Sequence, residues 1–268
     1  MIGAILGDMI GAPYEFNRSP KTKVFPLFSR GTEFTDDSVM TIAVAEALMD
    51  TAGKTDDEVR AALISSMRKW GRRYPDAGYG RMFYEWLHEK DPRPYGSYGN
   101  GSAMRVSSAG WLFDTLEKTR HMAGLTAEVT HNHPEGIKGA QATAAAVFLA
   151  RTGKSKEEIR DYITEEFGYD LDKTMDDIVS KGHGEEICQV SVPQALVCFL
   201  LSDSFIDTIR RSVSIGGDSD TIACIAGGIA EAFYGIDEEY QKIVYDRIDD
   251  TLEEILSLFD RHRIERTI

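Results

Sequence analysis

The stretch SIGGDSDTIACIAGGIAEAFYG, Ser214 to Gly235, places a turn of two glycines directly before an apolar helix. Asp218, Asp220 and Thr221 lie where the turn passes into this predicted helix. Asp and Thr are preferred N-cap residues, and carboxylates are stabilised at the positive end of a helix. Read by itself, the cluster therefore indicates a helix cap rather than a site.

A second cluster far upstream changes this interpretation. The segment FTDDSVMTIAVAEAL, residues 34–48, repeats the arrangement, with Thr35, Asp36 and Asp37 before another apolar helix. Two caps do not need four aspartates, so we predict that the clusters face each other across one site. Carboxylates about 4 Å apart repel by about 4 kcal/mol per pair at an effective dielectric of ~20, and bound cations would remove that repulsion. Oxygen ligands without Cys or His favour Mg²⁺ or Mn²⁺ over Zn²⁺.

Length and composition indicate one domain that spans residues 1–268. The chain is 42% hydrophobic and 28% charged. The two acidic clusters are about 180 residues apart and must share one core to share a site. The formal net charge of −14 disfavours binding of nucleic acid through its phosphates, which depends on Lys and Arg. We expect a monomer.

The first residues form an apolar segment that is neither a signal peptide nor a membrane span. The segment lacks a basic start, contains Asp8 and stops at Pro13. Cys188, Cys198 and Cys224 show no C-x-x-C spacing. This predicts buried free thiols, no disulfide partner and a reducing, cytoplasmic location.

Glycine recurs every four residues in that first segment, at Gly3, Gly7 and Gly11. In a helix this spacing forms a stripe on one face, where another backbone can approach closely. We interpret the stripe as a packing surface that draws the helix into the interior. Asp8 and Glu15 are exceptions, because packing would keep the acidic end of this helix beside its partner. Glu15 is therefore a candidate site residue.

A loop of unusual composition, DPRPYGSYGNGSAMR, spans residues 91–105. Its glycines leave backbone amides open to an anion, and its tyrosines offer rings that can stack on a base. Further on, His131 and His133 are two residues apart. That spacing fits neither a helical H-x-x-x-H pair nor a zinc site with Cys partners, so the histidines do not predict zinc.

Apolar spacing predicts an all-α fold. Helices are expected over residues 56–73, 82–90, 139–151, 155–181, 193–201 and 237–263, and a loop over residues 17–33. The last helix is predicted to be single, long, acidic and amphipathic. No run alternates apolar and polar residues for long enough to form a sheet.

Five motifs in the observed order give the chain a resemblance to a known family. They are GDMIGAPYE at 7–15, TDDS at 35–38, GSYGNGSAMR at 96–105, TH at 130–131 and SIGGDSDT at 214–221. The chain resembles the ADP-ribosylglycohydrolases, which include dinitrogenase reductase-activating glycohydrolases and the arginine-specific and serine-specific ADP-ribosylhydrolases. The third motif is nearer to the serine-specific type. The resemblance implies an all-α orthogonal helical bundle around two Mg²⁺ or Mn²⁺ ions.

The resemblance also implies roles for particular residues. The metal ligands would be Thr35, Asp36, Asp37, Asp218, Asp220 and Thr221. The substrate-binding residues would be Gly96, Ser97, Tyr98, Gly99, Asn100, Gly101 and His131. Glu15 would act beside Asp36 and Asp218 in catalysis, either as the base or as a gate over the site.

The implied reaction is hydrolysis of the C1″ glycosidic bond between ADP-ribose and an acceptor, with ADP-ribose as a product. The acceptor would be a protein side chain such as Ser or Arg, or another ADP-ribosylated molecule. Two alternatives stay open. A metal-dependent nucleotide phosphohydrolase would also cluster Asp on helices, but members of that kind usually show an H-D pair or E-x-x-E repeats, and the sequence has no H-D dipeptide. An ADP-ribose reader without turnover would lose metal ligands, whereas every ligand position is filled.

Overall fold

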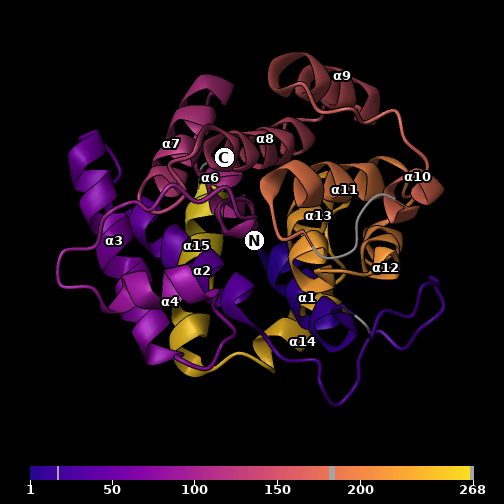
Figure 1. The fold of residues 1–268 in the computed structure, drawn as a ribbon, viewed down its shortest axis with the longest axis horizontal. Helices are drawn as coiled ribbons and strands as arrows, with labels where there is room; N and C mark the ends of the chain where they lie inside the picture. The colour runs from indigo at the N-terminus through magenta and orange to yellow at the C-terminus, as the bar shows by residue number, and fades with distance from the viewer. Residues whose placement is uncertain (17, 181–184, 266–268) are drawn as a thin grey trace.

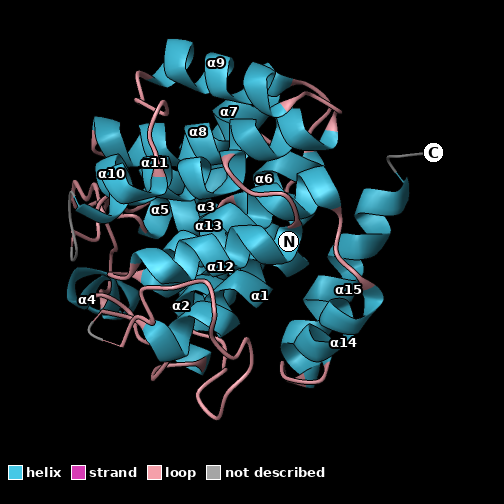
Figure 2. Cartoon of the chain, turned by 90° about the vertical axis from the view of Figure 1, so that its right-hand side faces the viewer, coloured by secondary structure: helices cyan, strands magenta, loops and turns pink. Residues whose placement is uncertain are grey.

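The computed structural model describes residues 1–16, 18–180 and 185–265, and this part of the chain is helical without a β-sheet (Figure 2). The all-α prediction is therefore confirmed. The elements are α1 (Ile2–Gly11), a 3₁₀ turn (Ala12–Tyr14), α2 (Asp36–Asp50), α3 (Asp56–Arg73), α4 (Arg81–His88), α5 (Gly101–Met104), α6 (Ser107–Leu112), α7 (Leu116–Glu128), α8 (Pro134–Arg151), α9 (Lys156–Phe167), α10 (Met175–Ser180), α11 (Cys188–Leu200), α12 (Phe205–Ile215), α13 (Ser219–Tyr234), α14 (Glu238–Tyr245) and α15 (Asp250–Glu265).

Helices α1 and α13 form the centre of the molecule, where they lie side by side (Figure 1). Every residue of α1 is buried, and so is every residue of α13 from Ser219 to Glu231. A helix that is buried on all sides needs apolar or small residues all round, which both sequences supply. The stretch that begins at Ser214 therefore contributes the central helix of the fold.

The glycine stripe of α1 packs against the backbone of α13, as predicted. A Cβ atom added to Gly3 would collide with the carbonyl of Gly227, and one added to Gly7 would collide with the carbonyl of Ala223. One added to Gly11 would meet the backbone of Asp220. The absence of side chains lets the two backbones approach this closely and fixes their register.

The other helices surround this pair. On one side α8, α11 and α12 pack against α13, and α8 also carries α5, α6, α7 and α9. On the other side α2 packs against α1 and α3, and α15 packs against α2 (Figure 1). The start of α2 is thereby brought to the same end of the α1–α13 pair as the start of α13. None of the helices in the described ranges is long and apolar enough to cross a membrane.

Several local predictions are confirmed. Helix α3 covers the predicted residues, residues 18–35 contain no helix, and the three cysteines are buried and free. Helix α11 begins at Cys188 rather than at Pro193, so the proline lies inside the helix. The backbone amide of Cys188 donates to the carbonyl of Tyr98, so this extra turn packs against the glycine-rich loop.

The helix predicted over residues 155–181 is wrong in part, because the structure breaks it into α9 and α10. Gly168 ends α9 with a φ of 69°, a left-handed conformation that a helix cannot continue through. A new helix begins after Thr174, whose hydroxyl accepts from the amide of Asp177 while the carboxylate of Asp177 accepts from Thr174. Residue 181 lies outside the described residues.

The single tail helix predicted over residues 237–263 is also wrong, because it is divided into α14 and α15. The carboxylate of Asp249 accepts from the amides of Thr251 and Leu252, which makes Asp249 the cap of a second helix. The hydroxyl of Tyr74 also bonds to Asp249 and ties the break to the end of α3. Periodicity alone does not reveal such a break, since both halves keep the same apolar spacing.

We expect Gly7→Ala to lower the free energy of unfolding by about 1–3 kcal/mol, because the added methyl group must force α1 away from α13. Gly31→Ala is a matched control, since a Cβ there would meet Pro13 at an ordinary 3.6 Å. The control should change stability by less than about 0.5 kcal/mol. Urea denaturation of both variants measures this, and equal stability of the two would contradict close packing at Gly7.

Candidate active site

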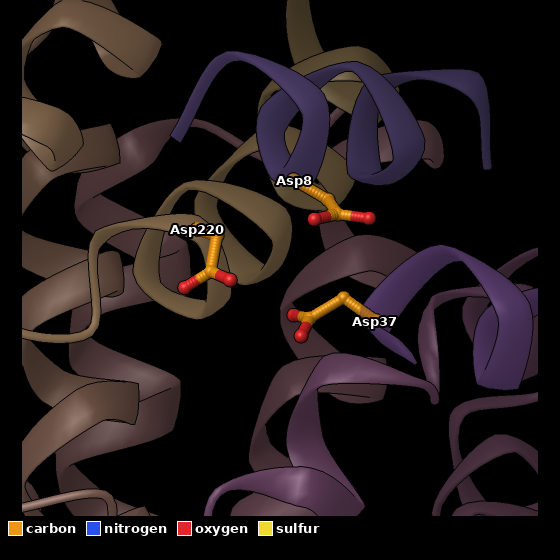
Figure 3. A group of neighbouring side chains, drawn as sticks. All are labelled: Asp8, Asp37 and Asp220. Carbon is orange, nitrogen blue, oxygen red and sulfur yellow. The ribbon is translucent and has the colours of Figure 1, made fainter. Parts of the chain in front are cut away.

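Three helices bring their acidic side chains together at one end of the central pair (Figure 3). Asp8 comes from α1, Asp37 from the first turn of α2, and Asp220 from the first turn of α13. Each offers a carboxylate oxygen, and these oxygens lie within 4.8 Å of one another. The hydroxyl of Thr221 donates to Oδ2 of Asp37 over 3.1 Å. The two acidic clusters therefore face each other, as predicted from the sequence.

Capping occupies little of this acidic set. Thr35 is the N-cap of α2, where its hydroxyl accepts from the amide of Asp37. Asp218 stands at the N-cap position of α13, but its side chain makes no capping bond. The turn before it needs Gly216 and Gly217, whose φ angles are 83° and 71°. The carboxylate of Asp218 is therefore not used to cap α13.

Asp8 also belongs to the site, although the sequence pattern marks it only as an exception within the glycine stripe and not as a metal ligand. It is fully buried, and its two oxygens accept four hydrogen bonds, from the amides and the hydroxyls of Thr35 and Ser38. Three of these bonds reach Oδ2 and one, from the hydroxyl of Thr35, reaches Oδ1, so Oδ2 is fully occupied while Oδ1 keeps a lone pair. Asp8 therefore positions the start of α2, and its signal in the sequence is a charged residue within a glycine stripe.

Burial and mutual repulsion raise the pKa values of the clustered carboxyls. Burial, followed by the charges of Asp8, Asp218 and Glu15, raises the pKa of Asp36 to about 8. Burial raises the pKa of Asp8 to about 6 against the opposing effect of its hydrogen bonds. The pKa values of Asp37 and Asp220 are raised well above the usual range for the same reasons, burial first and neighbouring carboxylates second. Without a cation, the cluster favours bound protons.

The residues fit a divalent cation. Oδ1 of Asp37 is buried and has no hydrogen-bond partner among the described residues. A buried carboxylate oxygen without a donor is unfavourable unless something positive contacts it. The surrounding donors are carboxylates and a threonine hydroxyl, which are ligands of Mg²⁺ and Mn²⁺.

A second acidic group joins the first through Asp220. Glu15, Asp218 and Asp220 each offer an oxygen, all within 4.8 Å of one another. Glu15 follows the 3₁₀ turn after α1, and the next residue, Phe16, donates its amide to the carbonyl of Gly217. Arg18 forms an ion pair with Glu15 at 2.8 Å. Glu15 thus lies at the edge of the cluster, which fits the role beside Asp218 that the resemblance implied for it.

A pocket of about 520 Å³ opens beside the acidic cluster. Its lining includes most of the predicted site residues, namely Glu15, Asp36, Asp37, Ser97, Gly99, Asn100, Gly101, His131, Asp218, Asp220 and Thr221. Thr35, Gly96 and Tyr98 are not part of the lining. Tyr98 is 45% exposed, with its ring centroid 5.1 Å from that of His133, so any stacking on a base would take place outside this pocket. Glu186 and Arg105 also line the pocket, and the sequence motifs predict no role for either.

The glycine-rich loop is less open to an anion than its composition suggests. The amide of Gly96 donates to Oδ1 of Asn132, and the amide of Gly99 donates to the hydroxyl of Ser97 within the loop. The amide of Asn100 donates to the carbonyl of Glu186. These three amides hold the loop in shape. The amides of Ser97, Tyr98 and Gly101 make no hydrogen bond to another described residue and stay available to a ligand.

Asn100 connects this loop to the acidic cluster. Its side-chain amide donates to Oδ2 of Asp218 at 2.6 Å and to the hydroxyl of Ser191 at 2.9 Å. The side chain is buried, so the contact fixes the distance between the loop and the start of α13. A ligand bound along the loop is thereby directed toward the carboxylates.

Comparisons with known proteins show which family the chain resembles over its length. A family model described as ADP-ribosylglycohydrolase matches residues 1–265. ADP-ribosylhydrolase ARH3 of Mus musculus is 31% identical, over 89% of this chain and 83% of the relative. ADP-ribosylarginine hydrolase Tri1 of Pseudomonas putida is 26% identical, over 97% of this chain and 77% of the relative. A solved ADP-ribosylglycohydrolase-related protein shares the fold, with a TM-score of 0.67 at 21% identity over 99% of this chain and 96% of that chain.

The raised pKa values predict how stability depends on pH. A carboxyl whose pKa is higher in the folded than in the unfolded state gives stability that is lost as the pH rises through the folded value. For Asp8 and Asp36 this window runs from the ordinary value of 3.8 to about 6 and about 8. After chelation, the melting temperature should fall as the pH rises through that window.

Divalent cations bind the ionised carboxylates, so the increase in melting temperature on adding Mg²⁺ should be larger near pH 8 than near pH 6. Calorimetry of the chelated protein with and without Mg²⁺ measures both effects, and Na⁺ at equal ionic strength is the control. A pH-independent effect of Mg²⁺ would contradict the acidic cluster as its binding site.

Proposed function

The chain belongs to the ADP-ribosylglycohydrolase family, and on that premise we propose that it hydrolyses the C1″ glycosidic bond between ADP-ribose and an acceptor. The observation that carries the proposal is the bond from Asn100 to Asp218, which joins the glycine-rich loop to the acidic cluster in one pocket. An ADP-ribosyl hydrolase needs a nucleotide-binding loop beside the acidic cluster, because the nucleotide must be held while the anomeric carbon C1″ lies at the carboxylates.

Two Mg²⁺ or Mn²⁺ ions would be held by Asp36, Asp37, Asp218, Asp220, Thr221 and Thr35. When bound, such ions supply positive charge that orients hydroxyl groups and makes water more acidic. Thr35 is committed to Asp8 and to the cap of α2, so its role is the weaker one in this set. Asp8 would orient the start of α2 through its hydrogen bonds to Thr35 and Ser38.

The protein residues then supply binding, orientation and proton transfer. The free amides of Ser97 and Gly101, which line the pocket, would bind the anionic part of ADP-ribose together with His131. The bond from C1″ to the acceptor breaks, a bond from C1″ to the oxygen of water forms, and the acceptor leaves with a proton. Glu15 lies at the edge of the cluster and would accept the proton that the attacking water loses, which balances the proton that the acceptor takes up as it leaves.

We propose a protein side chain as the acceptor. Serine is favoured over arginine, because the loop motif GSYGNGSAMR is nearer to the serine-specific members of the family. Tri1 of Pseudomonas putida, one of the relatives, is named for the arginine linkage, so the two acceptors need a direct comparison.

The test is a parallel assay of the purified protein with Mg²⁺ against serine-linked, arginine-linked and nucleic-acid-linked ADP-ribose. Release of ADP-ribose, measured by chromatography, should be fastest from the serine-linked substrate and should stop on chelation. Binding of ADP-ribose without release from any substrate would contradict the hydrolase and identify a reader instead. Fastest release from the arginine-linked substrate would refute only the acceptor preference.

Glu15→Gln should lower kcat by roughly 10²–10⁴, the range for loss of a general base, with bound metal unchanged. Asp218→Asn should lose bound metal together with turnover, because it removes a ligand charge. Glu117→Gln, on the exposed face of α7, is the matched control and should behave as the wild type. Kinetics and metal analysis of the three variants distinguish the roles, and wild-type turnover by Glu15→Gln would exclude it as the base.

A further inference from the structure

A buried polar chain runs from α5 to the pocket. Arg105 is 1% exposed, and its guanidinium donates to the carbonyl of Thr126 at 2.8 Å and to the hydroxyl of Thr130 at 2.7 Å. The hydroxyl of Thr130 lies 2.7 Å from Nδ1 of His131. Thr130 is fully buried and His131 is 5% exposed, so water has little access to these groups.

The direction of the hydrogen bonds follows from what each group can donate. A guanidinium only donates, so the oxygen of Thr130 must accept from Arg105. The hydroxyl proton of Thr130 then needs an acceptor, and Nδ1 of His131 is the acceptor within reach among the described residues. A buried hydroxyl proton without an acceptor is unfavourable, so Thr130 donates and Nδ1 carries no proton.

The other ring nitrogen of His131 faces the glycine-rich loop. A Cβ atom added to Gly101 would lie 3.1 Å from Nε2 of His131, and one added to Gly99 would lie 3.5 Å from it. His131 lines the pocket, and Nε2 has no hydrogen-bond partner among the described residues. Burial, with a further contribution from the charge of Arg105, lowers the pKa of His131 well below its ordinary value. The ring is therefore neutral, and its one proton is on Nε2.

We propose that Thr130, oriented by Arg105, acts as a positioning residue that fixes His131 in the tautomer whose Nε2–H donates into the pocket. The donor would meet an anionic oxygen of the ligand beside the free amides of the loop. This inference rests on the proposed function for the identity of that ligand, ADP-ribose. The tautomer itself is a property of the protein and is independent of the ligand.

A purely structural role for Thr130 predicts a different result. Its backbone already holds the loop, since its carbonyl accepts from the amide of Tyr95. If the side chain served packing alone, a residue of the same shape without a hydroxyl would leave His131 unchanged. Thr130→Val is such a residue, and Thr130→Ser restores the hydroxyl with a smaller side chain.

The experiment compares these two variants with the wild type by long-range ¹H–¹⁵N correlation of the histidine rings, which distinguishes protonated from unprotonated nitrogens. The His131 signals are assigned as those missing from a His131→Asn spectrum. Thr126→Val is the matched control, because it removes another buried hydroxyl of the same segment, one that bonds to Ala123. ADP-ribose affinity is measured by calorimetry on the same samples.

The wild type, Thr130→Ser and Thr126→Val should all show an unprotonated Nδ1 in His131. Thr130→Val should lose this single tautomer and bind ADP-ribose about tenfold more weakly, as expected for a hydrogen bond to a charged group. A protonated Nδ1 in the wild type, or an unchanged ring and affinity in Thr130→Val, would overturn the inference. A wild type with the expected tautomer that does not bind ADP-ribose would instead refute the proposed function and support the tautomer assignment.

Discussion

The packing of α1 against α13 is the constraint on which the site depends. Gly7 lies against the carbonyl of Ala223, and Gly11 lies against the backbone of Asp220, so the two helices have one register. Asp8 follows Gly7 in the chain and is thereby held beside Asp220 (Figure 3). Any residue larger than glycine in the stripe would separate the backbones and with them the carboxylates. The closeness that packs the core is thus the same closeness that builds the acidic cluster.

That closeness works against the stability of the protein without cations. Buried carboxylates repel each other and lose their solvation, which is why the pKa values of Asp36, Asp37 and Asp220 are raised. The fold tolerates the cluster because the rest of α1 and α13 is buried among apolar residues. Asp8 differs from its neighbours, because the amides and hydroxyls of Thr35 and Ser38 donate four hydrogen bonds to its carboxylate. These bonds hold the start of α2 in a fixed position beside α1.

The glycine-rich loop is shaped from both sides. The segment after α7 contacts it through Thr130, His131 and Asn132, and the start of α11 contacts it through Cys188. The backbone amides of Gly96, Gly99 and Asn100 are already used in hydrogen bonds that hold the loop. The loop therefore offers only its remaining amides to a ligand. Such preorganisation reduces the entropy lost on binding and favours one orientation of the nucleotide relative to the carboxylates.

The sequence by itself determined the all-α fold, the limits of α3 and the glycine stripe, because these follow from spacings of two to four residues along the chain. The repetition of an acidic helix start predicted that the two clusters share one site, but not which of their atoms meet. Tertiary structure alone decided the role of Asp8, the helix breaks at Gly168 and Asp249, and which loop amides are free. These depend on partners far along the chain, such as Ser38 for Asp8 and Asp37 for Thr221, which are 30 and 184 residues away. Local patterns report a residue's preferences, whereas packing between distant segments decides which of its atoms are already bonded and which remain for a ligand.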